Sequence, residues 1–280
     1  MSEKKQHKWI WVLVMVLSVA MAGGAVGVAA FFLWPKETNY DVFRPTTTQT
    51  DHPADPTESV PTESTPQQGD PDATEQTTTA EPLPDNPVDF AALQAVNPDA
   101  YAWIYVPNTL IDYPVLQAGA DLPEDFYIYR NLQKNYEFRG CIYSQKTNAK
   151  DFSDPVTVLY GHHMLDNSMF STLYYFRDQK FFDENEFFYI YTPGHILTYR
   201  IVSAHQYDER HILNSFDFSK EAVFQEYLDE ISNPRFMLAD VREGIELTTA
   251  DRIVTLSTCI SGGTQRYLVQ GVLIDDQATN

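Results

Sequence analysis

The sequence has few cysteines and few basic residues for its length. Only Cys141 and Cys259 occur among 280 residues, too few for a disulfide framework, and no paired Cys/His spacing suggests a structural zinc site. Lys and Arg number 19 against 39 Asp and Glu, a formal charge of −20. Phosphate binding needs clustered cations, so this balance argues against a nucleic-acid-binding protein. The sequence therefore predicts no metal, no cofactor and no nucleic-acid partner.

Lys and Arg are absent altogether from residues 45–87, which also have very few large apolar side chains. The segment contains 11 Thr, 9 Pro and 9 acidic residues. Such a composition cannot bury enough apolar surface to offset the entropy lost on ordering. We therefore expect residues 36–87 to form a disordered, self-repelling stalk that holds a domain away from a membrane.

Formal charge is absent from residues 9–34, where Val, Ala, Leu, Met and Phe dominate. A helix of this length can span the hydrocarbon core of a bilayer. Lys4, Lys5 and Lys8 precede it, and the positive-inside bias then predicts a cytoplasmic N-terminus and an extracellular remainder. A cleaved signal peptide is the alternative, with small residues at 20–22, but the run is too long for a signal sequence. We expect residues 1–35 to be a basic tip and a retained single-pass anchor.

From Val88 onward the composition favours one mainly β domain, residues 88–280. Short runs rich in Val, Ile, Tyr and Phe are separated by turn residues such as Pro193-Gly194. We expect strands over residues 101–107, 113–117, 141–144, 156–160, 187–191, 195–207, 253–258 and 267–274. Eight such strands suggest a closed or nearly closed β-barrel.

Helical spacing of apolar residues occurs in three places. Residues 90–96 predict a short helix, and residues 169–176 predict another with Asn167 or Ser168 as its N-cap. The longest candidate, residues 219–231, carries one apolar stripe opposite charged residues. We interpret all three stripes as faces that pack on the barrel.

Three residue types that can carry out nucleophilic catalysis occur where strands begin or end. Cys259 ends one predicted strand, and Arg266 opens the next strand after a short loop, which would bring its guanidinium beside the thiol. His162 and His163 end another strand, so an imidazole could face the same rim. A cysteine needs a cationic or basic neighbour to become a thiolate at neutral pH. This combination indicates an active site more strongly than any one of its members.

The domain resembles a sortase, and specifically a class B sortase, one of the membrane-anchored cysteine transpeptidases of Gram-positive bacteria. The resemblance covers nearly all of residues 88–275. Thr-Leu-Ser-Thr-Cys at 255–259, followed by Arg266 on the next strand, is its strongest part. The matching pieces are residues 97–107, 111–115, 160–164, 255–259 and 266–271.

This resemblance implies an eight-stranded sortase barrel with peripheral helices and assigns roles to its site residues. Cys259 would be the nucleophile, His162 its acid/base partner and Arg266 the clamp for the oxyanion. Ser257 and Thr258 would contact the substrate. That substrate would be the sorting-signal peptide of secreted proteins, and an amine of a peptidoglycan precursor or of a pilin would be the acceptor. The long helix at 219–231 would help to wall the substrate groove.

Several residues compete for these roles. His163 is the alternative to His162, because strand alternation cannot decide between neighbours at a strand end; the family pattern places the catalytic histidine directly after glycine and favours His162. Cys141 is most simply a buried small hydrophobic residue. The other candidate histidines are expected to have packing or surface roles: His195, His205 and His211.

Two other functions account for parts of the sequence. A papain-like extracellular peptidase would place its cysteine before its histidine and at the start of a helix, which is not the order here. A stalked adhesin or binding module would explain the anchor and the stalk but not the Cys/His/Arg set. No carboxylate that could orient the histidine is evident from the sequence.

Overall fold

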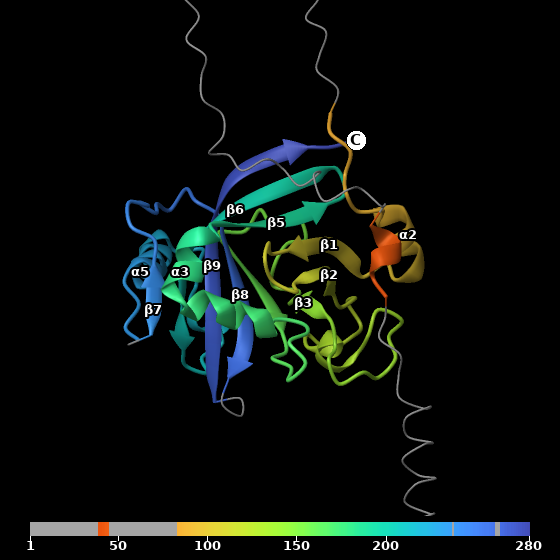
Figure 1. The fold of residues 1–280 in the computed structure, drawn as a ribbon, viewed down its shortest axis with the longest axis horizontal. Coiled ribbons are helices and arrows are strands. Elements are labelled where there is room, and N and C mark those ends of the chain that lie inside the picture. Colours follow the sequence, from red (N-terminus) through yellow and green to blue (C-terminus); the bar gives the residue numbers. More distant parts are fainter. Residues whose placement is uncertain (1–38, 45–82, 237, 261–263) are drawn as a thin grey trace, which may run out of the picture. The chain divides into compact units, whose positions relative to one another are not determined.

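A β-barrel dominates the computed structural model, which describes residues 39–44, 83–236, 238–260 and 264–280 (Figure 1). The strands within these residues are β1 Ala100–Tyr105, β2 Asp112–Gln117, β3 Ile142–Ser144, β4 Val156–Gly161, β5 Phe187–Thr192, β6 His195–Tyr207, β7 Ala239–Val241, β8 Ile253–Ile260 and β9 Gln265–Ala278. The α-helices are α2 Phe90–Val96, α3 Gln179–Glu184, α4 Ile212–Ser215 and α5 Glu221–Ser232, and the 3-10 helices are η1 Asp41–Phe43, η3 Phe126–Tyr129 and η4 Ser171–Arg177.

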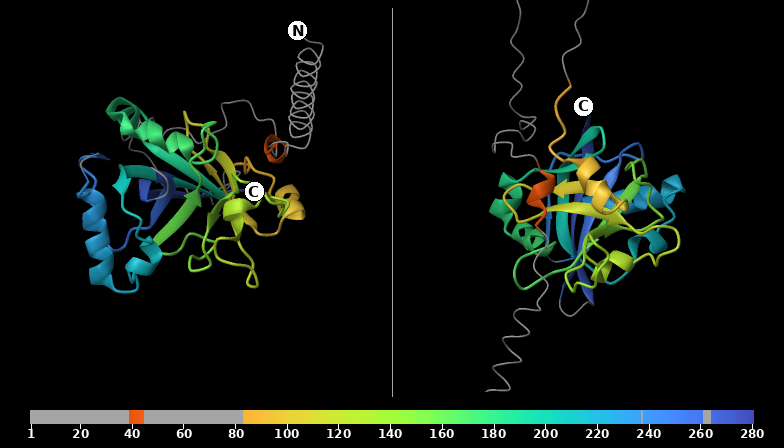
Figure 2. Two further views of the ribbon diagram at one scale, coloured as in Figure 1. Left: turned by 90° about the horizontal axis from the view of Figure 1, so that it is seen from below. Right: turned by 90° about the vertical axis from the view of Figure 1, so that its right-hand side faces the viewer.

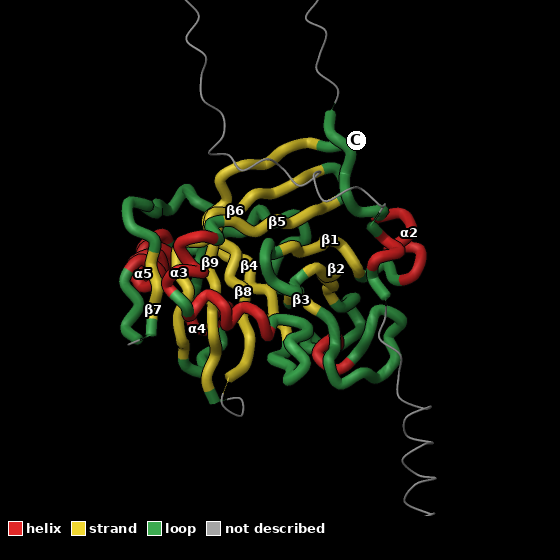
Figure 3. The backbone as a smooth tube through the Cα atoms, in the orientation of Figure 1, coloured by secondary structure: helices red, strands yellow, loops and turns green. Residues whose placement is uncertain are grey.

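The sheet closes on itself through eight of these strands. Their hydrogen-bonded order is β5-β1-β2-β3-β4-β8-β9-β6, and β5 also pairs with β6, so no edge remains between them (Figure 3). Two neighbouring pairs, β2–β3 and β4–β8, are parallel, and the other pairs are antiparallel. Closure fixes the register of β4, β8 and β9, which carry the predicted site.

The barrel is buried on both faces, which explains the near-continuous apolar runs of its strands. Its interior holds the largest core cluster, which includes Ile104, Leu159 and Val269. Two more clusters lie under the helices α2 and α5, on opposite sides of the barrel (Figure 2). The helices therefore cover the outer face, as a helix with one apolar stripe must.

All eight predicted strands are present, and a ninth was not predicted. β7 has three residues, all partly exposed, and pairs only with β6 at its outer side. Its sequence, Ala239-Asp240-Val241, is too short to show an apolar alternation. Sequence periodicity therefore gave no signal for it.

The predicted helices packed on the barrel are present, but one predicted N-cap is wrong. Helices α2 and α5 correspond to residues 90–96 and 219–231. The third is the 3-10 helix η4, which begins after Phe170, not after Asn167 or Ser168. Asn167 adopts φ +64°, and the Ser168 hydroxyl donates to the Asp166 carboxylate, so these residues form a turn before the helix.

The predicted anchor and most of the predicted stalk lie outside the described residues. Within the ranges that are described, no helix is both long enough and apolar enough to cross a bilayer. The predicted domain boundary at residue 88 needs correction, because residues 39–44 and 83–87 also pack on the barrel. Phe43 is buried, and its carbonyl oxygen accepts a hydrogen bond of 2.8 Å from the Asp89 amide. Asn280 donates to the carbonyl of Leu83 at 2.7 Å.

Candidate active site

Three adjacent strands place the predicted catalytic residues in one row. In the antiparallel pair β8–β9, Cys259 lies directly opposite Arg266. In the parallel pair β4–β8, the last paired residues are Gly161 and Thr258, and His162 and Cys259 come directly after them. Residues opposite one another on neighbouring strands have side chains on the same face of the sheet, at the spacing of side-chain contact. The barrel register therefore brings His162, Cys259 and Arg266 together.

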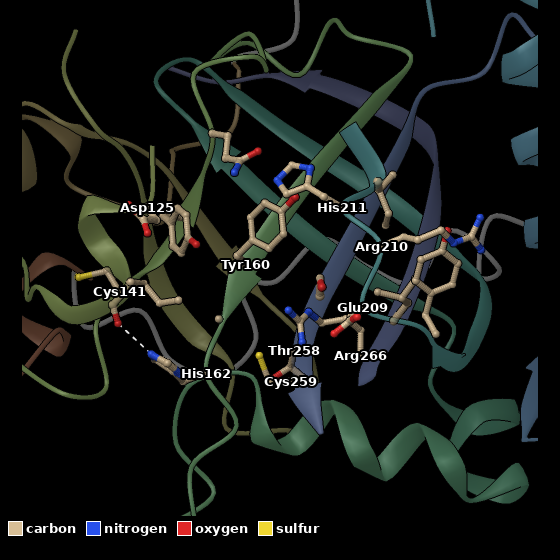
Figure 4. A pocket seen from close by; sticks show the side chains of 18 residues that line it. Asp125, Cys141, Tyr160, His162, Glu209, Arg210, His211, Thr258, Cys259 and Arg266 are labelled. Atoms are coloured by element: carbon tan, nitrogen blue, oxygen red, sulfur yellow. Dashed lines mark hydrogen bonds between the residues drawn. The ribbon is translucent and has the colours of Figure 1, made fainter. Parts of the chain in front are cut away.

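This row forms the floor of a pocket of about 280 Å³ (Figure 4). Loops from both sides of the row complete the walls. The lining residues include Asp125, Ile128, Cys141, Tyr143, Tyr160, His162, Tyr207, Glu209, Arg210, His211, Ser257, Thr258, Cys259 and Arg266. Cys259 is partly exposed, so a substrate can reach its thiol. The pocket thus combines a thiol, an imidazole and a guanidinium at one accessible place.

Ser257 and Thr258, the predicted substrate contacts, both line this pocket but are almost fully buried. The Thr258 hydroxyl has no hydrogen-bond partner within the part of the chain that the structure describes. Thr258 alternates with Cys259 along β8, so its side chain shares the interior face of the barrel with Leu256 and Ile260.

His162 is held in one orientation by a backbone carbonyl. Its Nε2 lies 2.9 Å from the carbonyl oxygen of Ile128. A carbonyl can only accept a hydrogen bond, so Nε2 carries the proton and Nδ1 is the basic nitrogen. The sequence offered no carboxylate for this task, and Ile128 performs it through its backbone. No side-chain signal could have identified that group.

Aromatic rings also enclose His162. Its ring stacks on Phe138 at 5.7 Å and 13°, and it contacts the ring of Tyr129 at 5.2 Å. Burial lowers the pKa of His162 below its usual value, and the hydrogen bond with Ile128 opposes this shift. The neutral imidazole is therefore favoured at neutral pH, as a base that takes a proton from a thiol requires.

Glycine is required at two positions around this histidine. Gly140 has φ +61°, and a Cβ there would collide with the carbonyl groups of Tyr127 and Ile128. A Cβ on Gly161 would collide with the side chains of Ile142 and Phe170. Gly161 therefore lets β4 approach its neighbours just before His162, and Gly140 lets the Ile128 carbonyl reach the imidazole.

The competing histidines occupy other environments. His163 turns away from the pocket, and its ring contacts Tyr174 at 4.7 Å. His205 is buried, which lowers its pKa to about 4, and His195 lies 2.7 Å from Asp276 at the surface. His211 is the exception, because it lines the pocket beside Tyr160, although only a packing or surface role was predicted for it.

Cys141 is buried, as predicted, although it also lies in the pocket wall. It is 2% exposed, and burial raises the pKa of its thiol to about 12. A thiol in that state is a poor nucleophile at neutral pH. The two cysteines are both free, so the thiol of Cys259 is not consumed in a disulfide.

One wall of the pocket was not predicted. Glu209, Arg210 and His211 follow β6 and precede α4. Arg210 lies 2.8 Å from Asp208 and 3.5 Å from Glu230 of α5, which ties this wall to the helix. A charged run after a long strand is typical of any exposed loop, so the sequence did not distinguish it. Among the described residues, no group of His, Cys, Asp and Glu could hold a metal ion.

Comparisons with known proteins identify similar chains. A family model described as the sortase domain matches residues 104–274. Sortase B of Staphylococcus aureus is 28% identical over 188 residues, covering 66% of this chain and 74% of that protein. The crystal structure of Clostridium perfringens sortase B is 33% identical, with a TM-score of 0.59, covering 66% of this chain and 99% of that one. A substrate complex of Staphylococcus aureus sortase B is 27% identical, with a TM-score of 0.59, covering 67% of this chain and 85% of that one.

Proposed function

Because the chain belongs to the sortase family, and within it to class B, it is a cysteine transpeptidase that anchors surface proteins, and we propose that Cys259, His162 and Arg266 carry its reaction. The observation that supports this assignment is the row of the three residues, with Cys259 and Arg266 paired on β8 and β9 and His162 directly after the end of β4. A papain-like peptidase and a stalked adhesin are not favoured, since neither explains that row.

The first half of the reaction forms a thioacyl enzyme. Nδ1 of His162 takes the thiol proton of Cys259, and the thiolate attacks the carbonyl carbon of the scissile peptide bond. The guanidinium of Arg266 hydrogen-bonds the oxyanion that develops on the carbonyl oxygen. When the C–N bond breaks, His162 returns its proton to the departing amine. The acyl group is then held on Sγ of Cys259 as a thioester.

The second half transfers the acyl group to an acceptor. An amine of a peptidoglycan precursor or of a pilin attacks the thioester, and His162 accepts the proton that the nitrogen loses. The lowered pKa of this partly buried imidazole supports both steps, because a neutral imidazole can accept the proton in each of them.

Ser257 and Thr258 are proposed to contact the sorting signal from the floor of the pocket. Both residues line the pocket, and Ser257 has its side chain on the same face of β8 as Cys259, two positions away. Ser257→Ala removes the hydroxyl from that face. It should raise KM for the peptide with a smaller change in kcat.

The chain is also proposed to be a single-pass membrane protein. The apolar run at 9–34 and the lysines before it support an anchor with a cytoplasmic N-terminus and an extracellular catalytic domain. Protease added to cells stripped of their wall should digest the domain. Protection of the domain, or a mature N-terminus near Gly23, would reject this arrangement.

The proposed function is tested by following both halves of the reaction. The enzyme is incubated with a panel of pentapeptide sorting signals, with and without a primary amine. Mass spectrometry should detect a thioacyl adduct and, with the amine present, a new amide product. Cys259→Ser should give neither species with any peptide. A ligated product from that variant would overturn the proposal.

A further inference from the structure

An exposed group of aromatic side chains begins at His162 and lies outside the pocket. Tyr129, Tyr136 and Phe138 are 42%, 65% and 59% exposed, and together they are called the aromatic shelf here. The ring of Tyr129 lies 5.2 Å from that of His162 and 6.5 Å from that of Tyr136. The shelf therefore extends from the imidazole outward over the surface.

The backbone under the shelf is fixed by hydrogen bonds. Arg130 and Tyr136 form an antiparallel bridge, and the Glu137 amide donates to the Tyr129 carbonyl at 3.1 Å. The Arg130 guanidinium lies over the ring of Tyr136 at 5.7 Å. Three large aromatic side chains are thus held at the surface by a short hairpin, although exposure gives them no packing benefit.

The chemistry of the row determines which part of the reaction faces the shelf. Arg266 and Cys259 handle the acyl carbonyl, whereas His162 handles the proton of the amine. Groups attached to the incoming amine must therefore lie on the His162 side of Cys259, where the shelf begins. The domain carries 14 basic and 27 acidic residues from position 88 onward, a net charge that draws a cationic acceptor toward the domain as a whole, although the Arg130 guanidinium already lies over one ring of the shelf, that of Tyr136.

We propose that the aromatic shelf binds the acceptor, as a chain that bears a primary ammonium group, before the amine attacks the thioester. This inference rests on the proposed roles of Cys259 and His162. Faces of Tyr and Phe attract ammonium groups through cation–π contacts. The acceptor loses one proton to solvent to become nucleophilic. On attack the C–N bond forms, the C–S bond breaks with its electrons returning to Sγ of Cys259, and the second proton passes to Nδ1 of His162.

The test separates acceptor binding from thioacyl formation. Tyr136 contacts neither Cys259 nor His162, and Tyr136→Ser should raise KM for acetyl-lysine amide about two- to fivefold, the range of one exposed cation–π contact. Thioacyl formation and peptide hydrolysis without the amine should be unchanged. Tyr136→Phe should restore acceptor binding. Tyr175→Ser, at a tyrosine that is 41% exposed on η4, is the matched control and should behave as wild type.

Two outcomes would overturn the proposal. An unchanged KM for the amine in Tyr136→Ser would show that the shelf does not bind the acceptor. A fall in thioacyl formation with unchanged aminolysis would show that it binds the leaving peptide. The proposed function fails separately, if the wild-type enzyme forms no thioacyl adduct at Cys259.

A second observation concerns the segment Asn39–Arg44, which lies between the proposed anchor and the Thr/Pro-rich residues. The Arg44 guanidinium lies 5.2–5.5 Å from the ring centres of Tyr105, Tyr191 and Trp103, and 3.1 Å from the Asp112 carboxylate. Tyr40 contacts the ring of Trp103 edge-on at 6.3 Å. With Phe43 buried as well, this segment is packed on the barrel through Tyr40, Phe43 and Arg44.

The position of this segment bears on whether the Thr/Pro-rich residues 45–82 can act as the spacer between the membrane and the catalytic domain. The described residues on both sides of residues 45–82 contact the domain: Arg44 pairs with Asp112, and the Leu83 carbonyl accepts a hydrogen bond from Asn280. A spacer that sets the distance between a membrane and a domain must be joined to the domain at one end only. Residues 45–82 do not satisfy that condition.

We infer that the docked segment Asn39–Arg44, not the Thr/Pro-rich residues, joins the anchor to the catalytic domain. Residues 35–38 then set the reach, at most about 14 Å when fully extended. The catalytic domain works close to the membrane surface. The inference predicts that the length of residues 45–82 has no effect on this distance.

The test uses the full-length chain in phospholipid vesicles that contain a lipid dye, with a fluorophore at Glu243→Cys in a Cys259→Ser background. Deleting residues 55–75 should leave energy transfer to the dye unchanged. Phe43→Ala with Arg44→Ala should release the segment, lower the transfer, and lower Tm by roughly 5–10 °C. Val42→Ala, at a residue of the same segment that is 69% exposed, should change neither value.

A rise in energy transfer after the deletion would overturn the inference, because it would show that residues 55–75 contribute to the reach. An unchanged Tm in the double variant would overturn it too, by showing that the segment does not dock. A chain that fails to bind vesicles would reject the proposed anchor. The Tm comparison in detergent then still tests the docking.

Discussion

The row of residues on β4, β8 and β9 differs from the loops that surround it in how its geometry is determined. In the row, Cys259 and Arg266 lie opposite each other because the register of the β8–β9 ladder pairs these two residues. In the loops, the Ile128 carbonyl and His211 reach the pocket through turns whose paths depend on distant contacts. The strands therefore position the proposed reacting groups, and the loops orient these groups and shape the pocket.

The sharpest form of this comparison is between the two cysteines. Cys259→Ala should abolish turnover, because it removes the nucleophile. Cys141→Ala should retain most of the activity and lose about 1 kcal/mol of stability through the missing sulfur contacts. Steady-state kinetics and thermal unfolding measure both effects. Loss of activity in Cys141→Ala without unfolding would mean that the wall residue takes part in the chemistry.

The arginine of the row should show a smaller effect. Arg266→Lys keeps the charge but loses the planar fork of donors, and should lower kcat/KM on the order of a hundredfold. Its Tm should hardly change, since a surface ion pair contributes about 1 kcal/mol or less.

Two controls limit the interpretation of Arg266→Lys. Alkylation of Cys259 by iodoacetamide should continue in this variant, because that reaction forms no oxyanion. Arg200→Lys, at a partly exposed arginine paired with Glu186 at 2.9 Å, should keep its activity. Near wild-type peptide cleavage by Arg266→Lys would show that Arg266 does not stabilise the oxyanion and is only a surface residue.

The loops can be tested through their glycines. Gly140→Ala should push the Ile128 carbonyl away from His162, and we expect roughly a tenfold loss in kcat/KM together with reduced stability. Gly244→Ala is the control, because Gly244 has φ +77° but nothing lies within 4 Å of its Cβ position. It should show the backbone strain of about 1–2 kcal/mol without the loss of activity. Equal activity in the two variants would show that the Ile128 carbonyl does not orient His162 for catalysis.

A buried histidine outside the site should affect stability alone. The folded-state pKa of His205 is about 4, below the value near 6.5 of an unfolded chain. The unfolded state therefore binds more protons between these values, and stability that is full above pH 6.5 falls as the pH drops toward 4. Over this window the loss is about 3 kcal/mol. His205→Gln should flatten the fall, measured by urea unfolding from pH 7 to pH 4, with kcat unchanged.

The sequence was informative where periodicity and strand order determine structure. All eight barrel strands and the helices at 90–96 and 219–231 have strong apolar patterns, and the positions of Cys259 and Arg266 follow from a short loop between two strands. It was uninformative where the structure depends on contacts between distant residues. β7 is held only by its pairing with β6, Ile128 acts through its backbone, and Asn39–Arg44 packs on rings that come from β1 and β5.

The choice between two neighbouring histidines tests the central claim, that strand register assembles the site, most directly. The two histidines are consecutive in the chain, but the side chain of His162 lines the pocket and that of His163 contacts Tyr174. The measurement is kcat/KM for peptide cleavage by His162→Ala and His163→Ala, both shown to be folded by their Tm. We expect a loss of about a hundredfold or more for His162→Ala and only a modest loss for His163→Ala. A reversal of these two phenotypes would contradict the central claim.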